Sequence, residues 1–126
     1  MSRWRPTTFI CGRGAGDDRL SKTALAAIET ASTVLVSPIT FFEIAQKVRL
    51  GKWPEMEPYV EQLPVLLREQ GGVAADFSPA LCVRAGMLDW SHRDPFDRFL
   101  AATALLGHVP LISADTVFDG MVTRVW

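Results

Sequence analysis

The chain has 126 residues, of which 48% are hydrophobic and 21% are charged, and its formal net charge is -1 at pH 7. This length and hydrophobic content indicate one domain, residues 1–126, with enough apolar material for a core. A near-neutral charge excludes a protein that coats nucleic acid with a basic surface, because neutralising phosphates requires an excess of lysine and arginine. No apolar run is long enough for a signal peptide or a membrane span, so we expect no membrane association and a cytoplasmic protein.

The two cysteines give no sign of a disulfide framework or a zinc site. Cys11 and Cys82 lie far apart in the chain and outside any spacing typical of metal ligands. We therefore expect two reduced, buried thiols.

Helices and short strands alternate in the first half of the chain. The expected elements are a helix capped by Ser21, a strand over residues 33–36, and a helix that begins after Ser37 and ends before Gly51. Pro38 fits the first turn of that second helix, where its missing N–H group costs nothing.

The second helix is predicted to be amphipathic. The i, i+3, i+4, i+7 spacing places four apolar residues on one face: Phe41, Ile44, Ala45 and Val48. Glu43 lies off this face. One interpretation of Glu43 is an exposed ion pair with Lys47, four residues later in the favoured order.

The middle of the chain predicts shorter elements. Residues 55–70 carry helix formers interrupted by Pro58 and Pro64, which indicates one short helix or two. A strand follows over residues 73–77. Ser78 then caps another helix, again with a proline in its first turn.

The last helix and the strand after it carry the acidic residues of interest. Asp94 can cap this helix with Pro95 in the first turn, and the apolar run over residues 99–106 indicates that the helix is buried. Residues 109–113 predict a short buried strand. Asp115 emerges just past its end, where open α/β sheets place their ligands.

The alternation of elements predicts an α/β fold. A turn at Asp119 and Gly120 leads to a final strand over residues 122–126. Helices alternating with short apolar strands are typical of a mostly parallel sheet flanked by helices.

Three carboxylates are candidates for one site: Glu43, Asp97 and Asp115. If their helices and strand meet at one sheet edge, they form a set of oxygen ligands suited to Mg²⁺ or Mn²⁺. Such cations support phosphodiester cleavage. Arg98 is a candidate phosphate contact, and Ser113 a candidate partner of a metal-bound water or of an Asp115 oxygen.

Each of these residues also has an ordinary structural interpretation. Asp94 and Asp97 resemble a capping box, in which acids complement the helix dipole. Asp115 can be a turn residue after a strand. His92 is more often a histidine at the surface or the core edge than a catalytic base. Spacing alone does not decide between these interpretations.

Three motifs together resemble one known family. Residues 37–47, 92–104 and 111–115 are similar in order and spacing to the PIN-domain ribonucleases, and most similar to the VapC-type toxins of bacterial toxin–antitoxin pairs. The resemblance covers the chain from about Asp17 to the C-terminus. It implies a three-layer PIN-like α/β sandwich.

The resemblance also implies an activity, a metal and partners. The implied function is that of a metal-dependent endoribonuclease toxin that hydrolyses RNA phosphodiester bonds and is restrained by a small antitoxin, with a homodimer as the assembly. Mg²⁺ or Mn²⁺ would be held by the residues at the acidic positions of the family: Glu43, Asp97 and Asp115. The supporting residues would be Asp94, Ser113 and Arg98.

The N-terminal segment departs from the family pattern. Pro6 stands where the family has its first metal-site aspartate, Thr7 follows it, and residues 1–14 contain no acidic residue. Arg3 and Arg5 on either side of this position would weaken a cation site. We therefore expect weak metal binding and weak cleavage.

Two alternatives stay open on the sequence. One is a catalytically inactive PIN domain that still binds RNA or an antitoxin. The other is a receiver-like phosphoacceptor domain, which shares the α/β architecture but needs a lysine late in the chain, whereas the last lysine here is Lys52.

The aromatic content predicts self-association. Four tryptophans and seven phenylalanines are many for this length. We expect part of this aromatic surface to be exposed around Trp53, Pro54 and Tyr59 as an interface between copies.

Overall fold

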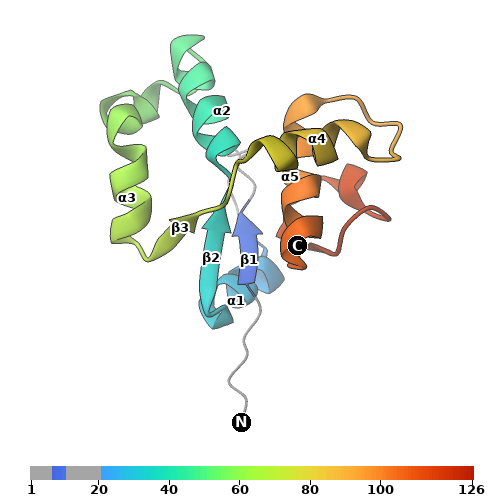
Figure 1. Ribbon diagram of the computed structural model, residues 1–126. Helices are drawn as coiled ribbons and strands as arrows, with labels where there is room; N and C mark the ends of the chain where they lie inside the picture. The colour runs from blue at the N-terminus through green and yellow to red at the C-terminus, as the bar shows by residue number, and fades with distance from the viewer. Residues whose placement is uncertain (1–6, 11–20) are drawn as a thin grey trace.

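The computed structural model describes the backbone of residues 7–10 and all of residues 21–126, and it confirms the α/β fold (Figure 1). Within these residues, five strands form one sheet in the order β3-β2-β1-β4-β5. Every pairing is parallel, where the sequence predicted a mostly parallel sheet. The strands are β1 (Thr7–Ile10), β2 (Thr33–Val36), β3 (Gly72–Ala74), β4 (Leu111–Ile112) and β5 (Arg124–Val125).

Helices flank the sheet, with α2 and α3 to one side and α4 and α5 to the other in Figure 1. Their bounds are α1 (Lys22–Thr30), α2 (Pro38–Arg49), α3 (Leu63–Glu69), α4 (Pro79–Met87) and α5 (Pro95–Gly107), with 3-10 helices η2 (Pro54–Gln62) and η3 (Thr116–Phe118). None of the helices in the described residues combines the length and apolar character needed to cross a membrane.

Side-chain caps begin four of the α-helices, as the sequence predicted. Each cap oxygen accepts a hydrogen bond from a backbone N–H two or three residues later. The four caps are Ser21 at 3.0 Å, Ser37 at 3.3 Å, Ser78 at 3.2 Å and Asp94 at 2.9 Å. Such a bond satisfies one of the N–H groups that a helix start leaves without a partner.

The core forms around α5, which the sequence predicted to be buried. Leu100, Ala101 and Ala104 are at most 2% exposed and pack against Leu111 and Phe118. The small alanines allow the helix to approach the sheet closely, while the larger side chains fill the space.

The buried face of α2 differs from the prediction. Thr40 and Glu43 are buried, whereas the face expected from Phe41 and Ile44 is only partly covered. Phe41 instead lines a small hollow with Pro64 of α3 and with residues of the edge strand β3, and α2 also contacts η2. The apolar pattern of α2 therefore marks the side that faces this hollow, while Thr40 and Glu43 on another side are the buried residues of the helix.

The strand order places a topological switch point at β1, the place where α/β folds bind ligands at the carboxyl edge of the sheet. The chain passes from β1 outward to β2 and β3, then returns to β4 on the other side of β1. At such a reversal the connections leave in opposite directions, which opens the ligand crevice of α/β folds. The segments around this edge are the start of α2, the residues after β4 and, because α5 runs antiparallel to β4, the start of α5.

Some predictions concern residues outside this description. Pro6, the flanking Arg3 and Arg5, and Cys11 lie outside the described residues. Cys82, predicted to be buried, is exposed as a free thiol on α4, because α4 turns its other side toward α5.

Candidate metal centre

Asp97 is the most buried carboxylate among the described residues. It lies in the first turn of α5 and is 1% exposed. Its Oδ2 atom is 2.7 Å from Nε2 of His92, whose side chain is 29% exposed. An ionised carboxylate only accepts hydrogen bonds, so the Nε2–H group of His92 is the donor. This bond fixes the orientation of a carboxylate whose charge the N-terminus of α5 also favours.

Asp94 completes a group of metal-ligand side chains at the same helix start. Its Oδ1 atom accepts a hydrogen bond from the N–H of Phe96 at 2.9 Å, which confirms its predicted role as the cap. Within the described part of the chain, one ligand atom from each of His92, Asp94 and Asp97 lies within 4.8 Å of the others. The other two predicted ligands, Glu43 and Asp115, do not belong to this group.

Arg98 holds the loop between α4 and α5. Its guanidinium donates hydrogen bonds of 2.7 to 3.3 Å to five backbone carbonyls, those of Ala85, Gly86, Leu88, Trp90 and His92. The fork of N–H groups on arginine suits several acceptors at once. A phosphate contact, the role expected from the sequence, would require Arg98 to give up some of these bonds. The geometry instead gives Arg98 the role of shaping the loop that presents His92.

Aromatic packing holds the His92 ring from a second side. The ring centroids of Trp90 and His92 are 5.0 Å apart, and Trp90 also packs on Phe118 at 5.9 Å. Phe118 is fully buried. The imidazole is therefore held through its backbone carbonyl, its ring and its Nε2 atom.

Glu43 lies in the second turn of α2 and is 9% exposed. This burial contradicts the interpretation of Glu43 as an exposed surface ion pair. The adjacent Phe42 stacks on Phe96 with ring centroids 5.7 Å apart, and Phe96 is the neighbour of Asp97. The stack joins α2 to the start of α5, so it brings the segments that carry the two buried carboxylates together.

Asp115 follows β4 and caps the short helix η3. Its Oδ1 atom accepts from the N–H of Val117 at 3.0 Å, and its own N–H donates to Oγ of Ser113 at 3.1 Å. Ser113 is 4% exposed. It therefore bonds the backbone of Asp115, where the sequence analysis considered a bond to a carboxylate oxygen or a metal-bound water.

Arg124 of β5 lies beside this turn. Its Nη1 atom donates to the carbonyl of Ser113 at 3.2 Å, and its Nε atom donates to Asp119 at 2.7 Å. The hydrogen bond and the charge of Asp119, together with the charge of Asp115, raise the pKa of Arg124. The turn after β4 is thus fixed both by its own cap and by a neighbouring strand.

The structure groups only part of the predicted site. His92, Asp94 and Asp97 form a close cluster, while Glu43 and Asp115 come from segments at the same sheet edge. His92 lies at the core edge, as one interpretation of the sequence had it, but its bond to Asp97 was not predicted. The spacing His-x-Asp-x-x-Asp around the cap of α5 was the available signal.

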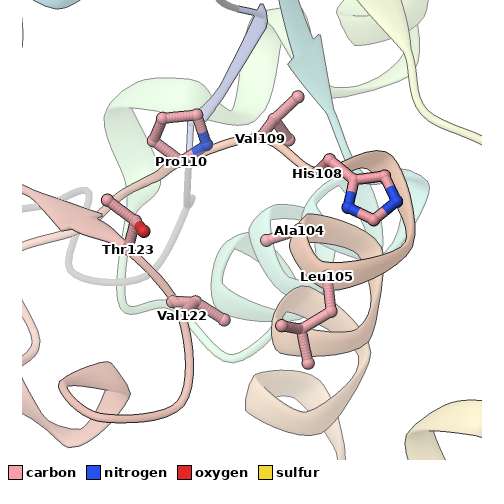
Figure 2. A pocket seen from close by; sticks show the side chains of 7 residues that line it. All are labelled: Ala104, Leu105, His108, Val109, Pro110, Val122 and Thr123. Carbon is pink, nitrogen blue, oxygen red and sulfur yellow. The ribbon is translucent and has the colours of Figure 1, made fainter.

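The hollow in Figure 2 lies at the opposite end of α5. It has a volume of about 390 Å³ and lies between the end of α5 and the segments entering β4 and β5. Its lining is Ala104, Leu105, His108, Val109, Pro110, Val122 and Thr123. This lining has no carboxylate, so it lacks the ligands that a hard cation requires.

Comparison with known proteins gives a family and a fold. The model of the family described as "PIN domain" matches residues 10–122. No curated protein matches the sequence.

Two solved structures are similar to the chain. FitAcB from Neisseria gonorrhoeae is 18% identical, with 93% of this chain and 95% of that chain covered and a TM-score of 0.59. FitAB bound to an IR36 DNA fragment is also 18% identical, with 93% and 92% covered and a TM-score of 0.56. At this identity the likeness shows the fold alone.

Proposed function

The chain belongs to the PIN-domain family, and from this premise we propose that it is a metal-dependent endoribonuclease, the toxin of a toxin–antitoxin pair. It would hydrolyse RNA phosphodiester bonds, with Mg²⁺ or Mn²⁺ held by Glu43, Asp97 and Asp115. The observation that carries the proposal is the carboxylate of Asp97, which is 1% exposed at a helix start on the ligand-binding edge of the sheet.

The donor chemistry of these residues fits a hard divalent cation. Glu43 and Asp97 are buried carboxylates on segments joined by a ring stack, and burying two such charges near one another is costly without a cation between them. When bound, such a cation supplies activation of water and stabilisation of the charge that develops on the scissile phosphate.

The residues around the carboxylates supply orientation. His92 holds Asp97 through the 2.7 Å hydrogen bond, and Arg98 holds the loop that carries His92. Ser113 holds the backbone of Asp115. These contacts limit the movement of two proposed ligands before substrate binds. A displacement of about 1 Å at a reacting centre can cost a hundredfold in rate, so such restraint matters for cleavage.

The partners of the proposed function are RNA, an antitoxin and a second copy of the chain. Tyr59 of η2 is 51% exposed and Pro54 is also exposed, while Trp53 is partly buried. An exposed aromatic ring with adjacent apolar side chains is suited to a protein interface. We expect sedimentation at tens of micromolar to show a dimer, and a monomer alone would contradict self-association.

RNA cleavage tests the proposal directly. We expect the chain to cleave RNA only when Mg²⁺ or Mn²⁺ is added, and Asp97→Asn to lower the rate about 100-fold or more. Glu57→Gln, at an exposed carboxylate of η2, is the matched control and should cleave like the unmodified chain. Metal-independent cleavage, or equal loss in both variants, would contradict the proposal.

The second candidate function is an inactive PIN domain that binds RNA or an antitoxin. Pro6, where the family has an aspartate, is the observation that favours it. If the first acid is what limits activity, Pro6→Asp should raise both Mn²⁺ affinity and cleavage. Asp97→Asn in the Pro6→Asp background should then remove the gain. Binding of RNA without cleavage in both chains would favour the inactive domain.

A further inference from the structure

We propose that His92, Asp94 and Asp97 form a second cation site, selective for Zn²⁺ over Mg²⁺, which shares Asp97 with the proposed catalytic cation. The shared role of Asp97 rests on the proposed function, whereas binding of Zn²⁺ by the cluster does not. Occupation of this site by Zn²⁺ inhibits RNA cleavage, because it engages Asp97.

The donor set distinguishes this site from the all-carboxylate one. An imidazole nitrogen with two carboxylates suits Zn²⁺ and related transition metals, whereas Mg²⁺ prefers oxygen ligands alone. Three protein ligands plus water are a common zinc arrangement in enzymes. The side chains of His92, Asp94 and Asp97 supply that number.

The distances are close to those of a bound ion. Ligand atoms on a tetrahedral Zn²⁺, at about 2.1 Å from the metal, lie roughly 3.4 Å apart. The three ligand atoms here lie within 4.8 Å of one another, and the His92–Asp97 pair is at 2.7 Å. Binding therefore needs side-chain shifts of the order of 1 Å, which the partly exposed His92 and Asp94 can make without movement of the helix.

Contacts around the site fix the position of His92 before an ion binds. Arg98 bonds the carbonyl of His92 at 2.8 Å, and the ring of Trp90 lies 5.0 Å from the imidazole. These contacts fix the backbone and the ring of His92 in position, and fixed orientation of a metal ligand favours binding. The side chain of His92 is 29% exposed, so an ion from solvent can reach Nε2, where it replaces the proton that bonds Asp97 and that proton passes to Nδ1 or to solvent.

Titration calorimetry with Zn²⁺ and Mg²⁺ on the full chain tests the site. We expect His92→Gln to weaken Zn²⁺ binding at least tenfold. His108→Gln, at the other histidine of the chain, is the matched control and should bind Zn²⁺ like the unmodified chain. Glu43→Gln should keep Zn²⁺ binding and lose Mg²⁺ binding, while Asp97→Asn should lose both.

A second variant tests the site in case His92→Gln does not fold. Asp94→Asn keeps a residue that caps helices well and removes one ligand charge, so the fold should persist while Zn²⁺ binding weakens. Circular dichroism confirms the fold of each variant. Unchanged Zn²⁺ affinity in His92→Gln, or in Asp94→Asn if His92→Gln does not fold, would overturn the site.

Cleavage assays test the inhibitory role separately. In Mg²⁺, added Zn²⁺ should inhibit the unmodified chain, and His92→Gln should need at least tenfold more Zn²⁺ for the same fractional loss of its own activity. Equal inhibition of both chains would overturn the inhibitory role. If the chain binds Zn²⁺ through His92 but never cleaves RNA, the proposed function fails while the Zn²⁺ site stands.

Discussion

The two ends of α5 differ in the side chains that surround them. The start of the helix carries Asp94 and Asp97, the histidine bonded to Asp97, and an arginine that bonds five carbonyls. The other end borders a hollow of about 390 Å³ with a mostly apolar lining. The side chains that can ligate a metal therefore lie at the end of α5 that does not border this hollow.

This difference shows that the volume of a hollow does not indicate where metal-ligand side chains lie in this fold. The apolar hollow lies where α5 ends at Gly107 and the chain turns away at His108, which has a left-handed φ of 53°. The polar end arises because the helix start exposes N–H groups and a favourable dipole, which attract carboxylates. A functional site is therefore better sought at the polar end.

The largest expected effect on activity is that of a substitution at Glu43, the second buried carboxylate. Glu43→Gln keeps the size of the side chain and removes a proposed metal ligand, so we expect RNA cleavage to fall about 100-fold or more. Asp76→Asn, at an exposed carboxylate, is the control. Full activity of Glu43→Gln at all Mg²⁺ concentrations would remove α2 from the site.

The arginine that holds the polar end should matter most for stability. Arg98→Met removes hydrogen bonds to five carbonyls, and we expect the free energy of unfolding to fall by about 2–4 kcal/mol. Urea unfolding measures this change. Arg93→Met, at a neighbouring exposed arginine, should change it by less than about 0.5 kcal/mol. Equal effects would mean that the five-carbonyl arrangement does not hold the loop.

At the apolar end of α5, a substitution should raise the free energy of unfolding. His108→Gly relieves a left-handed residue at a helix end, so we expect stability to rise by about 0.5–1 kcal/mol. RNA cleavage should stay unchanged, because no proposed ligand lies there. A loss of cleavage in this variant would show that the two ends of α5 are coupled.

The smallest expected effect concerns the ion pair beyond β4. The hydrogen bond and charge of Arg124 lower the pKa of Asp119 below its ordinary 3.8. The pair therefore stabilises the fold above pH 3.8, and this contribution is lost as the pH falls through the lowered pKa of the folded state. Asp119→Asn should reduce the difference in urea midpoint between pH 7 and low pH slightly. The side chain of Asp119 is 55% exposed, so salt should weaken the effect.

Local signals made most of the fold predictable. The caps at Ser21, Ser37, Ser78 and Asp94 act within three residues, so the sequence alone located four helix starts. Strand lengths were less predictable, since the strand expected over residues 73–77 is observed as Gly72–Ala74. Strand bounds depend on neighbouring strands that a local pattern does not contain.

Long-range contacts explain what the sequence analysis missed. Arg98 bonds carbonyls six to thirteen residues earlier in the chain, and that requires the turn between α4 and α5 to be known. The prediction of the buried face of α2 was wrong for a related reason: Glu43 is buried beside Phe42, whose ring stacks on Phe96 of α5, a helix distant in sequence. Polar residues with two plausible roles are assigned only when their neighbours in space are known.

The most direct test of the proposed catalytic site is a crystal structure of the chain soaked in Mn²⁺, with an anomalous difference map to locate the ion. We expect an anomalous peak in contact with Asp97, with Glu43 and Asp115 facing it across the carboxyl edge of the sheet. Three carboxylates directed to separate surfaces, with no peak at Asp97, would contradict the proposed metal site and the ribonuclease function built on it.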